Sequence, residues 1–422
     1  MPRPPEKLPV TLVSGFVGAG KTSLVKHLLA HCAELRPAVL RPALIVNDAI
    51  VRDQGELDAI PRVQLQELQP HATPAPELPA PEHLIAMSQG CICCSLREEL
   101  LASVRQLAAE GQCDYLLIEA SGVTEPQPVA EAFTFEDEHG QGLSDVARLD
   151  TLVSVVNAES FLADWQSEDE LSTRQLALDA DDPRSVSDLL VAQIEFANVL
   201  VLSKVDRVSV EEAERIEALL RQLNPSARIL RANHGELRPE AVVNTGLFDF
   251  EAAEQAPGWI AALQGEPAPA DDEHGLNSFV YRARIPFHPE RFWALLGAAD
   301  TWTGVLRSKG FFWLASRMDV SGLWSHAGGS AMCEGTGPWY AALPENEWPD
   351  DPEQREQIRQ DWLEPWGDRR QELVFIGVDL DEAALRAKLD AALLREGELA
   401  SGPNSWAELV DPFPAWAGHE PA

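Results

Sequence analysis

The chain has 422 residues, too many for one ordinary hydrophobic core, so we expect two domains. Its 68 acidic and 33 basic residues give a formal charge of −35, a field that repels phosphate backbones and anionic membranes and disfavours both as partners. No apolar run is long enough to span a bilayer, and the opening MPRPPEKLPV lacks an apolar signal core. We therefore expect a cytoplasmic protein, in which clustered cysteines are metal ligands or redox groups.

The first motif follows a short β-rich run. Residues 10–14 (VTLVS) are predicted to form a buried strand, and residues 15–22 (GFVGAGKT) precede SLVKHLLAHC, whose leucines have helical spacing. Strand, glycine-rich loop and helix in this order form a Walker A motif. Its backbone N–H groups bind phosphate oxygens, its lysine reaches the β- and γ-phosphates, and its hydroxyl ligates Mg²⁺. The motif predicts a nucleoside triphosphate site at Gly15, Gly18, Ala19, Gly20, Lys21, Thr22 and Ser23.

Two more predicted strands, residues 43–46 (ALIV) and 84–87 (LIAM), are separated by a long loop rich in Pro, Gln and Glu. Asn47 and Asp48 begin this loop. By its position in the chain, between the first helix and the next strand, the loop is where a nucleotide-sensing switch is expected.

Three thiols lie within four positions of the segment GCICCS: Cys91, Cys93 and Cys94. The sequence SLREELLASVRQLAAEG has the pattern of an amphipathic helix, with Ser95 as N-cap and Glu98 completing a capping box. A helix N-terminus favours thiolate over thiol, and thiolate binds soft or borderline metals. The segment therefore predicts a metal site or a redox site.

Two later strands end in polar groups typical of a nucleotide site. Residues 115–118 (YLLI) lead into Glu119 and then Gly122, which predicts a Walker B carboxylate and a γ-phosphate-sensing turn. Residues 199–202 (VLVL) lead into SKVD, where Lys204 and Asp206 predict base recognition. The Asp206 carboxylate can accept the N1 and N2 hydrogens of guanine, which adenine cannot offer.

The alternation of strands and helices over residues 8–245 predicts an α/β fold: a P-loop NTPase with a doubly wound, mostly parallel sheet. We assign residues 1–247 to this domain, 248–275 to an acidic linker and 276–422 to a smaller α+β domain. In the second domain we expect strands at 278–285, 305–317, 322–329 and 372–380, and helices at 288–300 and 381–394. Its tryptophans are expected to pack in cores, with a docking surface as the alternative: Trp302, Trp313, Trp324, Trp339, Trp348, Trp362 and Trp366.

Together these motifs resemble the CobW-like family of metal-trafficking GTPases, especially its long, zinc-regulated branch (YciC/ZigA type) and the related nitrile hydratase activators. The resemblance covers nearly the whole chain. It is carried by GFVGAGKTSL, GCICC, LLIEASGVTEP and QIEFANVLVLSKVD, and in the second domain by RSKGFFWLASR, GLWSHAGG and PWGDRRQELVFIG.

The resemblance implies a GTPase, slow by itself and stimulated by metal or client, that acts as a metallochaperone or metalloprotein activator. Zn²⁺, or alternatively Co²⁺ or Fe²⁺, would be held by the three clustered cysteines and delivered to a client protein, with release coupled to GTP hydrolysis. Lys21, Thr22 and Glu119 would have the catalytic roles with Mg²⁺, while Lys204 and Asp206 would recognise guanine.

The chain departs from the family pattern in three places. Ser203 stands where the family usually has Asn, and its shorter side chain is expected to brace the P-loop less well. Residues 49–53 (AIVRD) replace a segment with a metal-associated acid, so no carboxylate metal ligand is assigned, and Glu56 and Asp58 are only candidates. The ten histidines are scattered, so no large metal reservoir is expected.

Two other classes of function remain open at this point. In a P-loop ATPase the cysteines would be structural or redox-active. A nucleotide-gated binding module would sequester a partner with negligible turnover. Among metallochaperones, cobalt or iron insertion into a nitrile-hydratase-like client is the alternative to zinc delivery. Three cysteines leave one tetrahedral position open, as transfer to a client requires.

Overall fold

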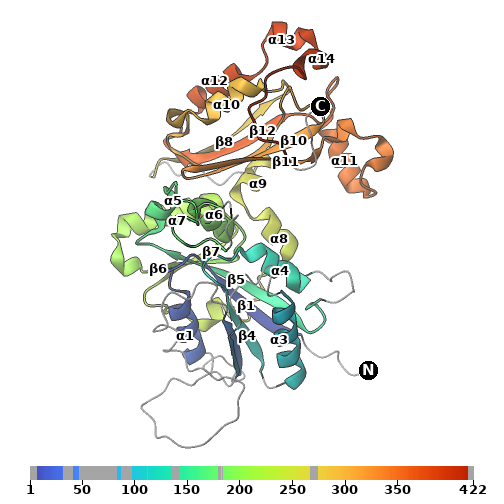
Figure 1. Ribbon diagram of the computed structural model, residues 1–422. Helices are drawn as coiled ribbons and strands as arrows, with labels where there is room; N and C mark the ends of the chain where they lie inside the picture. Colours follow the sequence, from blue (N-terminus) through green and yellow to red (C-terminus); the bar gives the residue numbers. More distant parts are fainter. Residues whose placement is uncertain are drawn as a thin grey trace, which may run out of the picture. The chain divides into compact units, whose positions relative to one another are not determined.

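The computed structural model describes residues 7–31, 41–46, 83–86, 97–111, 113–134, 142–178, 182, 184–266 and 274–416. The chain divides into two compact units, Met1–Gly258 and Trp259–Ala422 (Figure 1). The division falls within the segment predicted to be a linker, and this segment contains helices α8 (Phe250–Gln255) and α9 (Gly258–Leu263). Both helices form because each buries apolar side chains: Phe250 and Ala253 in α8, and Ala262 in α9.

The first unit is built on a seven-stranded sheet of order β3-β2-β4-β1-β5-β6-β7. Every adjacent pair is parallel, which confirms the predicted P-loop NTPase class of sheet. Valine, leucine and isoleucine fill these strands because a parallel sheet covered by helices is buried on both faces. The strands are β1 (Leu8–Ser14), β2 (Pro42–Val46), β3 (His83–Ala86), β4 (Tyr115–Glu119), β5 (Ala147–Asn157), β6 (Val199–Ser203) and β7 (Arg228–Ala232).

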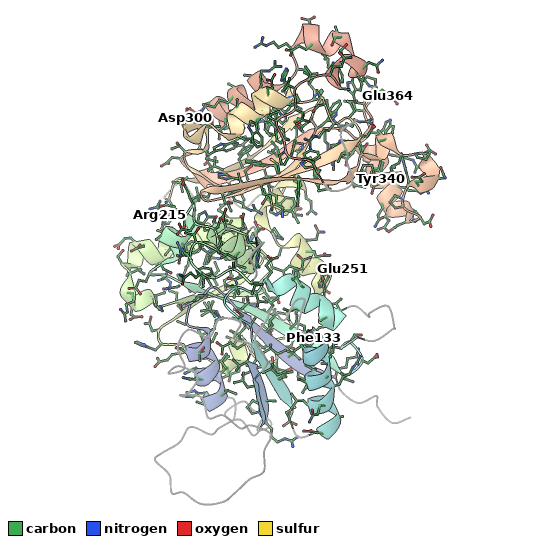
Figure 2. The ribbon with its side chains drawn as sticks, in the orientation of Figure 1. Phe133, Arg215, Glu251, Asp300, Tyr340 and Glu364 are labelled. Carbon is green, nitrogen blue, oxygen red and sulfur yellow. The ribbon has the colours of Figure 1, made fainter. Side chains whose placement is uncertain are left out.

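Helices cover both faces of this sheet, with α1 on one side and α3 and α4 on the other (Figure 1). Side chains fill the space between the layers, and Phe133 of α4, labelled in Figure 2, is 4% exposed. Serine caps begin two of the helices, since Ser185 accepts from the Asp188 N–H and Ser209 from the Glu212 N–H. The helices are α1 (Lys21–His31), α3 (Arg97–Glu110), α4 (Pro126–Thr134), α5 (Phe161–Trp165), α6 (Val186–Glu195) and α7 (Val210–Leu223).

The second unit contains a five-stranded antiparallel sheet of order β11-β10-β9-β12-β8. Aromatic rings build its core; for example, the ring centroids of Phe279 and Phe375 lie 4.9 Å apart. Its strands are β8 (Leu276–Ala283), β9 (Val305–Phe312), β10 (Val320–Ala327), β11 (Ser330–Pro338) and β12 (Gln371–Val378). Its helices are α10 (Pro289–Leu296), α11 (Pro352–Gln360), α12 (Glu382–Ala392), α13 (Glu396–Ser401) and α14 (Pro403–Trp406). The predicted α+β class is confirmed.

The tryptophans of the second unit pack as expected. Trp313, Trp324, Trp339 and Trp348 are buried, and Trp302, Trp362 and Trp366 are partly buried. Within the described ranges, no helix combines the length and hydropathy needed to span a bilayer.

Candidate functional site

The loop between β1 and α1 has the backbone of a phosphate cradle. Gly15, Gly18 and Gly20 have φ angles of 131°, 73° and 102°, which side-chain-bearing residues rarely adopt. A Cβ atom on Gly15 would lie 2.3 Å from the carbonyl oxygen of Val155 on β5, so only glycine fits there. The predicted Walker A segment therefore forms a tight loop at the carboxyl ends of β1 and β5, ahead of the N-terminus of α1.

Lys21 and Thr22 begin α1 and have distinct partners. The Lys21 ammonium donates to the carbonyl oxygens of Gly15 (2.8 Å) and Phe16 (3.0 Å), which holds its charge inside the loop. The Thr22 hydroxyl donates to Oε1 of Glu119 at 2.6 Å. Glu119 ends β4, where it is 5% exposed and in register with Val13 of β1. The fold thus brings the predicted Walker A hydroxyl and Walker B carboxylate together, and such an oxygen pair fits Mg²⁺.

Ser203 reaches the glycine loop directly. Its hydroxyl donates to the carbonyl oxygen of Ala19 at 2.6 Å, with the Val156 carbonyl oxygen at 3.2 Å. The side chain is 5% exposed, so water does not compete for this bond. The Ser203 hydroxyl thus supports the loop in spite of its short side chain, because the end of β6 lies against the loop.

The predicted base-recognition residues follow Ser203. Lys204 has a φ angle of 56°, and its ammonium donates to the Gly18 carbonyl oxygen at 2.9 Å. The Asp206 N–H donates to Oδ1 of Asn233 at 3.2 Å, while the Asp206 side chain is exposed beside Arg207. The structure therefore places Lys204 on the glycine loop and orients the backbone of Asp206 through a second loop.

That second loop, after β7, is a part of the site that the sequence analysis missed. A Cβ atom on Gly235, whose φ angle is 80°, would lie 2.7 Å from backbone atoms of Ser23 and Leu24. The loop therefore packs against the first turn of α1 and carries Asn233 to the Asp206 backbone. The available signal was Asn-His-Gly directly after residues 228–232 (RILRA), which is a turn pattern.

The turn after β4 also contacts the glycine loop. A Cβ atom on Gly122 would lie 2.6 Å from Cγ2 of Val17 and 2.8 Å from its Cα and N atoms. The Ala120 N–H donates to the Val13 carbonyl oxygen, which anchors the start of the turn on β1. The predicted γ-phosphate-sensing residue therefore lies in direct contact with the Walker A loop.

The predicted metal ligands Cys91, Cys93 and Cys94 lie outside the described residues, as do Ser95, Asn47, Asp48, Glu56 and Asp58. Within the described ranges, no group of three or more His, Cys, Asp or Glu side chains could hold a metal ion. Before the cysteines the backbone is described as far as Ala86, the last residue of β3. Ala86 pairs with Val46 of β2, and Val46 pairs with Glu119 of β4.

Comparison with protein families identifies the chain. Residues 9–231, more than half of the chain, match the model "CobW/HypB/UreG, nucleotide-binding domain". The chain belongs to the CobW/HypB/UreG family. Residues 276–393 match the "Cobalamin synthesis protein cobW C-terminal domain". The resemblance to CobW-like proteins is confirmed in both units.

Curated relatives of this family include proteins named for zinc. "Zinc-regulated GTPase metalloprotein activator 1" of Dictyostelium discoideum is 42% identical over 412 residues, which cover 97% of this chain and 84% of that protein. A zinc chaperone of Mycobacterium tuberculosis is 31% identical over 352 residues, which cover 81% of each chain. Among solved structures, Zn(II)-bound YjiA GTPase from E. coli is 18% identical with a TM-score of 0.37, and the match covers 92% of this chain and 100% of that chain.

Proposed function

We propose that the chain is a GTP-hydrolysing metallochaperone, or metalloprotein activator, that carries Zn²⁺. Cys91, Cys93 and Cys94 bind the ion, a client metalloprotein receives it, and GTP hydrolysis drives its release. Hydrolysis is slow until metal or client is bound. The proposal is supported by similarity over 97% of this chain to a relative named as a zinc-regulated GTPase metalloprotein activator, and over 81% of this chain to another named as a zinc chaperone.

The observation that carries the proposal is the register of three neighbouring strands. Ala86, Val46 and Glu119 are level with one another on β3, β2 and β4. Adjacent strands lie about 4.8 Å apart, so the backbones of Ala86 and Glu119 are about 10 Å apart. The described backbone that precedes the cysteine segment therefore ends level with the Walker B carboxylate. Four residues separate Ala86 from Cys91 in the sequence, so the proposed coupling between Glu119 and the cysteines runs through a short stretch of chain.

The residues of the nucleotide site supply positioning and charge. Thr22 and Glu119 would hold Mg²⁺, and the bound ion would neutralise negative charge on the phosphates. Lys21 places a fixed cation in the loop that cradles the phosphates. Lys204 ties the base-recognition segment to that loop through Gly18, so base and phosphate sites are connected. Asp206 accepts the guanine N1 and N2 hydrogens, which selects GTP over ATP.

The cysteines supply a transferable metal site. Three thiolates bind zinc through three of its four tetrahedral positions and leave one position for a ligand of the client. In this mechanism GTP holds the thiolates together, and loss of the γ-phosphate loosens the site and releases the ion. Cobalt and iron are the competing cargoes at the same ligands.

The proposal is tested by metal stoichiometry and nucleotide selectivity. Wild-type protein and a variant with Cys91→Ser, Cys93→Ser and Cys94→Ser are equilibrated with Zn²⁺, Co²⁺ and Fe²⁺, and bound metal is identified by elemental analysis. The matched control is Cys113→Ser, because Cys113 is a free cysteine of the same unit, buried before β4. We expect zinc on the wild type and the control and none on the triple variant, with GTP bound in preference to ATP. Retention of zinc by the triple variant, or equal binding of ATP, refutes the proposal.

A further inference from the structure

Two side chains from outside the turn after β4 hold its backbone. The Gln193 side-chain N–H₂ of α6 donates to the carbonyl oxygens of Gly122 (3.3 Å) and Thr124 (3.1 Å). The Nη1 group of Arg184 donates to the Val123 carbonyl oxygen (3.1 Å). The carbonyl oxygens of Gly122, Val123 and Thr124 therefore accept hydrogen bonds from side chains of other segments.

Each of the two side chains is itself fixed in place. Gln193 is 1% exposed, and both of its acceptors are carbonyl oxygens, so the amide nitrogen must face the turn. Asp182 accepts from Nε and Nη2 of Arg184, at 2.8 Å in each case. This two-point contact leaves Nη1 directed at the turn, where it also donates to Oε1 of Glu125 at 3.0 Å.

The same region of α6 is joined to the glycine loop by apolar packing. Phe16 of that loop and Val123 of the turn share one buried cluster with Leu171 and with Leu189 of α6. Gly122 lies against Val17, as described above. A displacement of the turn therefore changes its contact with the glycine loop and its hydrogen bonds to Gln193 and Arg184 at the same time.

We propose that Gln193 and Arg184 are positioning residues for GTP hydrolysis, which hold the Gly122–Glu125 turn in the arrangement that receives the γ-phosphate. The inference rests on the proposed GTPase function. It names the two side chains that hold the turn proposed to sense the γ-phosphate. Both residues act through the turn. Since the γ-phosphate that the turn is proposed to receive is absent from GDP, we expect their loss to affect GTP binding and to leave GDP binding nearly unchanged.

The test compares three variants with the full-length wild type. Gln193→Met keeps the length of the side chain without donors, Gln193→Glu turns carboxylate oxygens toward the carbonyl groups, and Arg184→Lys keeps the charge but loses the two-point geometry. Affinities for GDP and a non-hydrolysable GTP analogue are measured by fluorescent nucleotide titration, and kcat by phosphate release. For the Gln193 variants we expect the ratio of GTP to GDP affinity to fall about tenfold, together with kcat. Arg184→Lys changes both in the same direction to a smaller extent.

A matched control separates positioning from general stability. Asn224 is fully buried, and its side-chain amide donates to the carbonyl oxygens of Ile194, Glu195 and Ala197, at the C-terminal end of α6 next to Gln193. Asn224→Leu removes these bonds without touching the turn, so it should lower Tm and leave the nucleotide ratio unchanged.

Three results would overturn the inference. It fails if the Gln193 variants keep the wild-type ratio and kcat, or if Asn224→Leu shifts the ratio as strongly as they do. A wild type that does not bind or hydrolyse GTP refutes the proposed function, and the inference with it. If the wild type hydrolyses GTP and the Gln193 variants do so equally well, the inference is refuted and the proposed function stands.

Discussion

Gly122→Ala is the substitution that most directly tests the contact between the γ-phosphate sensor and the glycine loop. The new Cβ atom would lie 2.6 Å from Val17 Cγ2 and 2.8 Å from Val17 Cα and N, whereas carbon atoms in contact need about 3.5 Å. The Cγ2 atom can rotate away, but the backbone atoms cannot, so one of the two segments must move by about 0.7 Å. Gly122 lacks a left-handed φ angle, so the methyl group adds no backbone strain of that kind to the contact with Val17.

A displacement of this size matters for chemistry more than for folding. Overpacking costs about 1–3 kcal/mol of stability, whereas a 1 Å misplacement of a reacting group can lower a rate by about 100-fold. We therefore expect single-turnover GTP hydrolysis by Gly122→Ala to be slower by about 10- to 100-fold, with GDP affinity almost unchanged.

The control for this experiment is Gly397→Ala. A Cβ atom on Gly397 meets no atom within 4 Å, and its φ angle is also outside the left-handed region. This variant should hydrolyse GTP at the wild-type rate. If Gly122→Ala also keeps a rate within about twofold of wild type, the contact does not set the hydrolytic geometry and the reasoning is refuted.

Three further predictions concern other parts of the chain. Ser203→Ala removes the bond to Ala19, worth about 1 kcal/mol, so GTP and GDP should both bind about fivefold more weakly in a fluorescence titration; unchanged affinities would contradict the bracing role. Hydrogen bonds from Arg184 lower the pKa of Asp182 to about 2, so its stabilising contribution is present above about pH 4 and is lost as the pH falls through about 2. The Tm deficit of Asp182→Asn should accordingly shrink between pH 7 and pH 3, and a constant deficit would contradict this. Arg317→Met removes a buried arginine and leaves the partly buried Asp411 without its ion pair, so it should destabilise the second unit by about 3 kcal/mol in urea unfolding, whereas an unchanged midpoint would show that the pair contributes nothing.

The nucleotide-binding fold could be predicted because its signals are local in sequence. Residues 10–14 and 115–118 are apolar runs that end directly at Gly15 and Glu119, and the strands found there extend only a few residues further. Thr22 and Glu119 were assigned to one site from their motifs, and a hydrogen bond joins them. In such a fold the carboxyl ends of parallel strands meet at one edge, so residues in these motifs come together without further information.

The parts that escaped prediction depend on contacts distant in sequence. Strand β11, with the sequence SAMCEGTGP, has weak β propensity and forms because it pairs with β10. Gln193 has the appearance of an ordinary polar residue on an amphipathic helix until the turn at Gly122 is placed against it. The hydrogen bond from Ser203 to the Ala19 carbonyl oxygen could not be predicted, because the distance between β6 and the loop cannot be read from the residue type.

If the bound nucleotide controls zinc affinity, the zinc dissociation constant must differ between the GDP-bound and GTP-bound states of the protein. Zinc affinity is determined by competition with a chromophoric chelator, with the protein loaded either with GDP or with a non-hydrolysable GTP analogue. Coupling energies between sites are typically 1–3 kcal/mol, so the two affinities should differ by at least about fivefold, with tighter binding in the GTP state. The difference should vanish when Cys91, Cys93 and Cys94 are replaced by Ser. Equal zinc affinities with the two nucleotides would contradict the account.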